Sequence, residues 1–274
     1  MSIRLTRLAL AGLAFATSIG ATAAPLDLSS WSALTLNYPG GQGAGSWVLE
    51  PGNTAVTQVI NADPSFYLNN LSQTQYSIDG SWQVLQSGAG DDDYIGFVFG
   101  YQNSSNFYLF DWKRGTQNSV GQTAAEGMTL KRFTGATGDG LADLSLAEFW
   151  ENQVSFGDMA VLATNHSATA GWAVGTLYNF HLDFDIAPNT LHVVVMDGAT
   201  TLWETTVVDS TFNGGQFGFF NNSQQSVRYA GFEQTGGVPV TPGDGIPPIP
   251  EPQTYALMLA GLGVIGWAAR RRRR

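Results

Sequence analysis

The sequence predicts an all-β fold, a two-sheet antiparallel β-sandwich of the jelly-roll type. Many short segments alternate apolar with polar or β-branched side chains and end at Gly, Asn, Asp or Pro, as strands do. Aromatic residues make up 12% of the chain and charged residues only 12%, a balance that favours sheet faces over amphipathic helices. Cysteine is absent, so no disulfide stabilises the fold, and about 200 residues are enough for one sandwich core.

The central element is an aromatic hairpin that begins directly after three adjacent carboxylates, Asp91, Asp92 and Asp93. Residues 94–101 alternate with apolar side chains on both faces, which predicts a strand buried between other layers. The next five residues are amides and hydroxyls and predict a turn, and residues 107–112 return as a second aromatic strand.

The other elements follow in order along the chain. A glycine-rich loop at residues 40–45 lacks the spacing of a phosphate-binding loop. Residues 75–85 predict one strand, or two that break at Asp79-Gly80, and residues 141–151 have the periodicity of a helix. The remaining expected strands cover residues 31–36, 46–49, 54–60, 127–133, 159–163, 177–186, 190–196, 201–208, 215–221 and 226–233.

Three segments are expected to lie outside the fold. Residues 1–23 place Arg4 and Arg7 before an apolar run and small residues, the pattern of a secretory signal peptide removed by signal peptidase. Residues 235–249 are rich in Pro and Gly and predict an exposed linker, followed by a C-terminal tail. The globular domain is therefore expected at residues 24–234, in a protein that leaves the cytoplasm.

The tail, residues 250–274, has three parts: Pro250-Glu251-Pro252, an apolar segment at residues 255–269, and five arginines. The apolar segment is shorter than the about 20 residues of a stable span, which favours transient membrane anchoring over an ordinary single-span anchor. The tail resembles a PEP-CTERM sorting signal of Gram-negative bacteria. This resemblance implies cleavage by an exosortase-type protease and delivery to the cell surface or extracellular matrix.

The charge distribution restricts the class of partner. Of the 12 basic residues, two lie in the signal segment and five at the C-terminus, which leaves five, against 21 of the 22 acidic residues in residues 25–250. The net charge of that part is therefore −16, and it excludes nucleic acid as a partner because phosphates require basic side chains. Divalent cations and neutral glycans remain compatible, although acidity also serves solubility alone.

The hairpin carries a family resemblance. The stretch DDDYIGFVFGYQ begins at Asp91 and is followed by SS, FY, W, K and TQ. Together with residues 47–48, 61–64, 127–131 and 214–220, it resembles the C-terminal, lectin-like domain of thrombospondins. The resemblance extends over about residues 44–234 and implies a sandwich of the concanavalin or L-type lectin class.

The three adjacent aspartates are the first candidates for a metal site, because neighbouring carboxylates repel unless they are solvated or bridged. In an extended segment Asp91 and Asp93 point one way and Asp92 the other. Their spacing matches no EF-hand and by itself favours a solvated loop. The resemblance implies a calcium site at Asp91, Asp92 and Asp93, with Asp63, in the matching Asp-Pro turn, as a weaker ligand.

Other polar groups are weaker candidates. Glu148 and Glu151 could share a helix face as the carboxylate pair of a glycosidase, and Asp183 and Asp185 are expected on one face of a strand. The histidines match no metalloprotease helix and are expected to be isolated and structural: His166, His181 and His192. Three tryptophans could stack on sugars but are expected in the core: Trp112, Trp172 and Trp203.

These inferences predict an exported, non-enzymatic, calcium-binding, lectin-like protein of the cell surface or polymer matrix. It is expected to act in adhesion by binding extracellular polysaccharide or a surface protein. Two alternatives remain. A glycan-cleaving enzyme would need two opposed carboxylates in an aromatic-lined groove. A purely structural protein of the biofilm matrix would bind no ligand saturably.

Overall fold

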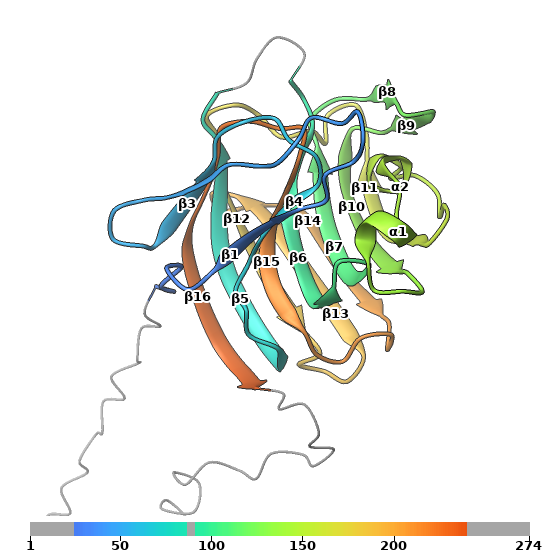
Figure 1. Cartoon of the computed structure of the whole chain (residues 1–274). Helices are drawn as coiled ribbons and strands as arrows, with labels where there is room; N and C mark the ends of the chain where they lie inside the picture. Colours follow the sequence, from blue (N-terminus) through green and yellow to red (C-terminus); the bar gives the residue numbers. More distant parts are fainter. Residues whose placement is uncertain (1–24, 87–90, 240–274) are drawn as a thin grey trace, which may run out of the picture.

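The computed structural model describes residues 25–86 and 91–239, which form two large antiparallel sheets packed face to face (Figure 1). The order in sheet A is β1 (Ser32–Thr35), β4 (Ser65–Leu68), β15 (Gln216–Asn222), β6 (Tyr94–Asn103), β7 (Asn106–Lys113), β10 (Gly127–Thr134) and β11 (Met159–His166). The order in sheet B is β14 (Thr200–Val208), β13 (Thr190–Asp197), β12 (Leu177–Phe184), β5 (Gln73–Val84), β16 (Val227–Pro239), β3 (Ala55–Gln58) and β2 (Trp47–Leu49). The predicted all-β jelly-roll sandwich is confirmed.

The main core lies between the two sheets and consists largely of aromatic side chains. Phe97 projects inward from β6 and stacks on Phe180 of β12 with ring centroids 4.8 Å apart. Phe180 stacks in turn on Trp82 of β5 at 4.7 Å. Each fully buried ring contributes roughly 1.5–3 kcal/mol relative to exposure, so this cluster is the main source of cohesion in a domain without disulfides.

A second cluster covers the opposite face of sheet A. The short helices α1 (Gly140–Asp143) and α2 (Leu146–Trp150) lie on this side, near β7, β10 and β11 (Figure 1). Phe149 of α2 stacks on Phe133 of β10 at 4.9 Å, and Phe133 on Phe107 of β7 at 4.8 Å. Sheet A is therefore buried on both faces, as expected for β6, whereas the outer face of sheet B keeps alternating polar side chains.

The single helix expected at residues 141–151 is wrong. Leu144 adopts extended φ and ψ of −110° and 148° and ends α1. Ser145 then begins α2, because Ser145 and Glu148 form a reciprocal capping box. The local capping residues divide a segment whose apolar periodicity suggested one helix.

Two expectations about chain breaks are also resolved. The Asp79-Gly80 pair does not break β5; Gly80 instead leaves room for a ring, since a Cβ there would lie 2.3 Å from Phe232. The linker was expected to begin at residue 235, but this boundary is too early. The backbone of β16 still pairs with β5 as far as Pro239, which lies opposite Gln73. A two-stranded ribbon, β8 (Gln117–Ser119) and β9 (Gln122–Ala124), completes the fold.

The predicted targeting segments fall outside the described residues. These are the signal peptide at residues 1–23, the remainder of the linker, and the tail with Pro250, Glu251 and Pro252. Within residues 25–86 and 91–239, no helix has the length and apolar character needed to cross a bilayer.

Candidate functional site

A cavity of about 550 Å³ lies at the end of sheet A where β4 and β6 begin and β15 ends. Because β15 runs antiparallel to both neighbours, the residues that precede β4, precede β6 and follow β15 meet at the same edge. Three carboxylates line the cavity, namely Asp63, Asp91 and Asp93. The sandwich topology thus brings together three of the four predicted metal ligands.

The three adjacent aspartates diverge in direction, as expected of an extended segment. Asp91 and Asp93 are buried and line the cavity. Asp92 is not among the lining residues; its carboxylate lies against Gly115, where a Cβ would be 2.8 Å from Oδ2. Asp92 therefore belongs to a different environment from its two neighbours.

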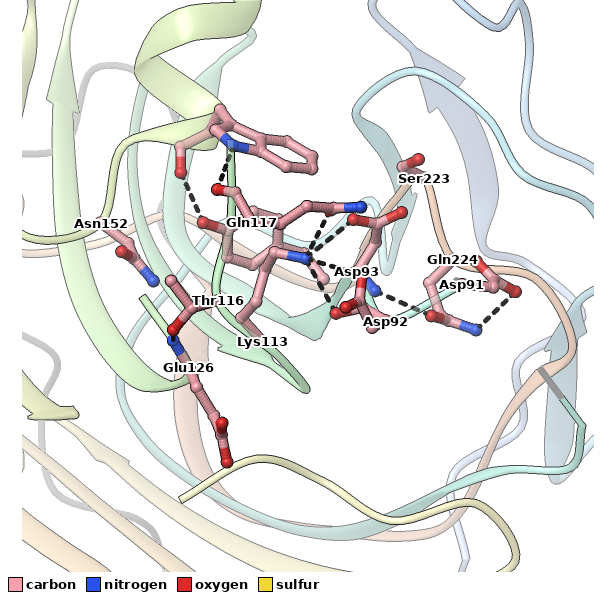
Figure 2. Close-up of polar contacts among 12 residues, drawn as sticks. Asp91, Asp92, Asp93, Lys113, Thr116, Gln117, Glu126, Asn152, Ser223 and Gln224 are labelled. Atoms are coloured by element: carbon pink, nitrogen blue, oxygen red, sulfur yellow. Dashed lines mark hydrogen bonds and ion pairs between the residues drawn. The ribbon is translucent and has the colours of Figure 1, made fainter. Parts of the chain in front are cut away.

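A buried lysine supplies the positive charge at this loop. The Lys113 ammonium is fully buried and donates to the Asp93 carboxylate at 2.9 Å and to the Asp92 carbonyl oxygen at 2.9 Å (Figure 2). It also donates to Gln117 Oε1 at 3.0 Å and lies 3.3 Å from Asp92 Oδ1. The Trp150 ring lies 4.8 Å from the ammonium, within cation–π range. Oxygen atoms surround Lys113 much as they would surround a metal ion.

Lys113 is not among the residues predicted for the site, although the hairpin sequence contains a signal for it. Lys113 ends the aromatic-rich strand β7, and in the register of β6 and β7 it pairs with Tyr94, the residue after Asp93. An antiparallel register drawn from the predicted turn places this lysine beside the acidic run.

Gln224 holds the two cavity-lining aspartates together. Its side-chain oxygen accepts a hydrogen bond from the Asp93 backbone N–H at 3.1 Å, and its side-chain nitrogen donates to Asp91 Oδ2 at 3.1 Å (Figure 2). Burial raises the pKa of Asp93, against the opposing effects of Lys113 and a hydrogen bond from Ser223. The electrostatic environment of Asp93 therefore still favours additional positive charge.

Asp63 has a clear role in the loop before β4. Its Oδ2 accepts from the Tyr38 N–H at 2.9 Å, and its Oδ1 accepts from the Gln42 N–H at 2.9 Å. The Gly41 backbone lies so close that a Cβ would be 2.2 Å from Asp63 Oδ1. The glycine-rich loop thus wraps around this carboxylate, whose oxygens each keep a further lone pair for the cavity.

The donor set of the cavity suits a hard cation. No histidine is among the lining residues. Besides the three carboxylates, the polar lining side chains are carboxamides and hydroxyls: Gln42, Asn61, Gln117, Asn118, Ser119, Asn222, Ser223 and Gln225. Calcium takes six to eight oxygen ligands of these types, so the residues present fit calcium.

The carboxylates considered for glycoside hydrolysis serve the backbone instead. Glu148 accepts from the Ser145 and Asp158 N–H groups at 2.6 Å each. Glu151 accepts from the Gln153 N–H at 2.7 Å. Both residues are buried, Glu148 in the middle of α2 and Glu151 at its C-terminal cap.

The expectations for the other polar residues hold only in part. Asp185 does not share a face with Asp183, because β12 ends at Phe184 and Asp185 adopts φ of +54° in a turn, where it accepts from the Asn189 N–H. The three tryptophans pack in or against the core, as expected. The expected isolation of the histidines is wrong for His181 and His192, which both contact Asp183.

Comparison with known families agrees with this architecture. Residues 42–235 match the model of the thrombospondin C-terminal region, and residues 248–274 match the PEP-CTERM protein-sorting motif. Thrombospondin-3b of Danio rerio is 28% identical over 192 residues, covering 68% of this chain and 20% of the relative. Cartilage oligomeric matrix protein of Bos taurus is 28% identical over 191 residues, covering 68% and 25%.

The chain thus spans about a fifth to a quarter of the length of these relatives. Among solved structures, the carbohydrate-binding module CBM66 from Bacillus subtilis aligns with a TM-score of 0.46 and 14% identity, covering 76% of this chain and 96% of that one. The VIP36 exoplasmic/lumenal domain aligns with a TM-score of 0.48 and 8% identity, covering 81% and 87%. On the family match, which covers most of its length, the chain belongs to the thrombospondin C-terminal region family.

Proposed function

We propose that the domain is a calcium-supported, lectin-like binding module that acts in adhesion by binding extracellular polysaccharide or a surface protein. The observation that carries this proposal is the convergence of Asp63, Asp91 and Asp93 on one polar cavity. Membership of the thrombospondin C-terminal region family supports it, since the acidic run lies within the matched residues.

The charge balance at the cavity explains why a divalent cation would stabilise it. Three carboxylates, those of Asp63, Asp91 and Asp93, line the cavity, and the ammonium of Lys113 pairs with only one of them, Asp93. Calcium bound by Asp91 and Asp93, with Asp63 as a further oxygen donor, would offset the remaining repulsion. Because these residues come from separate loops, the bound ion would also fix those loops relative to one another.

The lining chemistry indicates the class of ligand. Amide and hydroxyl side chains such as Asn61, Asn118 and Ser223 pair with the hydroxyls of neutral sugars, and Trp150 adds an aromatic surface. The volume of about 550 Å³ lies within the range of small-ligand sites. The acidity of the domain disfavours phosphate-rich polymers.

The location of the protein follows from its tail. The PEP-CTERM motif at residues 248–274 implies export and a surface or extracellular location. We further propose that signal peptidase removes the N-terminal segment and that an exosortase-type protease cleaves at Pro250-Glu251-Pro252 after transient membrane anchoring. The domain would then meet polysaccharide in the biofilm matrix. Binding is favoured over hydrolysis because Glu148 and Glu151 are occupied by backbone amides.

A thermal melt of the full chain tests the calcium site. EDTA is added first and Ca²⁺ is then titrated into wild type, Asp91→Asn and a control, Asp158→Asn, which removes an exposed carboxylate remote from the cavity. A cation that binds only the folded state raises the melting temperature, by the equivalent of about 2.7 kcal/mol at 100 times the Kd. Wild type and control are expected to respond and Asp91→Asn much less.

Glycan binding is measured next, with and without Ca²⁺. Saturable polysaccharide binding that is lost in EDTA and in Asp91→Asn is the expected result. An equal calcium response in all three proteins, or none, would remove the metal site from the proposal. Calcium binding without any saturable glycan or surface-protein ligand would instead favour a structural matrix role.

A further inference from the structure

The outer face of sheet B carries a cluster of two histidines and an aspartate. His181 and Asp183 lie two residues apart on β12 and therefore on the same face, and His192 of β13 pairs directly with Asp183 in the register. One ligand atom from each of the three side chains lies within 4.8 Å of the other two. The cluster is about a quarter exposed and is separate from the cavity at the end of sheet A.

Each imidazole ring lies between two carboxylates. His181 contacts Asp79 of β5 through Nδ1 at 2.8 Å and Asp183 through Nε2 at 3.1 Å. His192 contacts Asp183 through Nδ1 at 3.2 Å and Glu204 of β14 through Nε2 at 3.2 Å. Four adjacent strands, β14, β13, β12 and β5, thus contribute to one continuous row of side chains.

This arrangement requires positive charge beside Asp183. A neutral imidazole carries one N–H, so it can donate to only one of its two carboxylate neighbours, and its other nitrogen would direct a lone pair at a carboxylate oxygen. Among the described residues, the polar partners of His181, Asp183 and His192 include no lysine or arginine. A cation bound between the two rings would offset this negative charge.

We propose that His181 Nε2, the Asp183 carboxylate and His192 Nδ1 bind a divalent transition metal ion, with Zn²⁺ as the best fit. Two imidazole nitrogens and a carboxylate oxygen are ordinary zinc ligands, whereas calcium takes oxygen. One zinc ion would bring two positive charges to a row of side chains that contains three carboxylates, those of Asp79, Asp183 and Glu204.

The surrounding residues are those that orient metal-binding histidines. A histidine ligand usually donates its second N–H to a carboxylate, which fixes the tautomer and the ring orientation. Asp79 accepts from His181 Nδ1 and Glu204 from His192 Nε2, which leaves the nitrogens nearest Asp183 free to bind metal. Ser77 donates to the Asp183 carboxylate and holds it in place. Both rings therefore have a carboxylate partner on the nitrogen that faces away from Asp183.

The two histidines and Asp183 lie on the outer face of sheet B, where each side chain is about a quarter exposed and accessible to an ion from solution. Three protein ligands on an open sheet face leave at least one coordination position for water or for an outside carboxylate.

Cobalt absorption tests this proposal. The full chain, purified without a histidine tag and stripped with a chelator, is titrated with Co²⁺, whose visible d–d band reports coordination by nitrogen and oxygen. Wild type is expected to give the band and to lose it when Zn²⁺ is added. His181→Gln and His192→Gln are expected to weaken Co²⁺ binding by about 100-fold or more, since changing only an outer partner typically costs 10- to 100-fold.

His166→Gln is the matched control, because it removes a histidine that bonds to Thr129 instead. It is expected to bind Co²⁺ as wild type does. Circular dichroism and the unfolding midpoint establish that each variant is folded, as expected for part-exposed side chains. No d–d band with Co²⁺ in excess, or equal binding by His181→Gln and wild type, would overturn the proposal.

Discussion

The cavity end and the outer face of sheet B each gather several carboxylates, but they offset the negative charge differently. At the cavity end, the fully buried Lys113 side chain pairs with Asp92 and Asp93. On sheet B, His181 and His192 surround Asp183 and carry charge only when they bind a proton or a metal. The first cluster therefore has a cation that folding itself supplies, whereas the second must take its cation from solution.

The two clusters also differ in the ligand atoms that they offer to an ion. Oxygen donors around Asp91 and Asp93 match calcium, and imidazole nitrogens beside Asp183 match zinc. Acidic residues alone therefore do not define a metal site. A cation already present in the fold decides how much of their negative charge remains to attract an ion.

The largest effect is expected from Lys113→Met, which removes the cation of the first cluster. Breaking a buried ion pair by removing one partner costs about 3–5 kcal/mol, because the other charge stays buried and uncompensated. Urea unfolding measures this loss, and added Ca²⁺ is expected to restore part of it. Arg114→Met is the control and should cost less, since Arg114 is exposed where Lys113 is fully buried. A similar loss in both variants would show that Lys113 does not hold the acidic loop.

Asp63→Ala separates loop support from calcium binding. Hydrogen bonds to a charged group contribute about 1.5–3 kcal/mol, and the Tyr38 and Gln42 amides both lose their acceptor in this variant. Urea unfolding in EDTA is expected to reveal a loss of that size before any calcium is added. A loss that appears only with calcium present would instead make Asp63 chiefly a metal ligand.

Glu204→Gln sharpens the description of the second cluster. Removing the carboxylate that orients His192 is expected to weaken Co²⁺ binding about 10- to 100-fold, equivalent to about 1.4–2.7 kcal/mol. Asp158→Asn, which removes an exposed carboxylate that precedes β11 of sheet A, is the control and should leave affinity unchanged. Equal affinity in the two variants would mean that Glu204 does not position the ring.

The smallest effect concerns histidine titration in the metal-free protein. NMR is expected to place the pKa of His181 above 6.5, because the surrounding carboxylates outweigh burial, and that of His166 below it, because burial disfavours its charged form. His181 therefore adds stability below about pH 6.5 that is lost as pH rises through its raised folded pKa. The pH dependence has the opposite sign for His166, whose folded pKa is lowered. The stability that comes from keeping its ring neutral is lost as pH falls. The reverse order of the two pKa values would contradict this assignment.

The fold was largely predictable because its signals are local. Alternation in residues 94–101 and the amide-rich turn after them identify the hairpin, and they do not depend on distant contacts. Expectations were wrong where a tertiary or capping contact outweighs local pattern. Gly80 suggested a break but makes room for Phe232, and the Ser145–Glu148 capping box divides one predicted helix into two.

The site was predictable only where neighbours in sequence stay neighbours in space. The divergence of Asp91 and Asp93 from Asp92 follows from the two-residue period of extended chain. The contact of Asp183 with His192 requires the register of β12 and β13, and that of Asp79 with His181 requires the pairing of strands about 100 residues apart. Sequence periodicity carries no information about such distant pairing, so the histidine cluster could be identified only from the fold.

A crossed melting experiment on the full chain tests most directly whether the cavity and the outer face of sheet B hold two separate cation sites. Wild type, Asp91→Asn and His192→Gln are each melted in EDTA, in Ca²⁺ and in Zn²⁺. We predict that calcium stabilises wild type and His192→Gln but not Asp91→Asn, and that zinc stabilises wild type and Asp91→Asn but not His192→Gln. Loss of both responses in either variant, or no response in wild type, would contradict the claim that these are two separate cation sites.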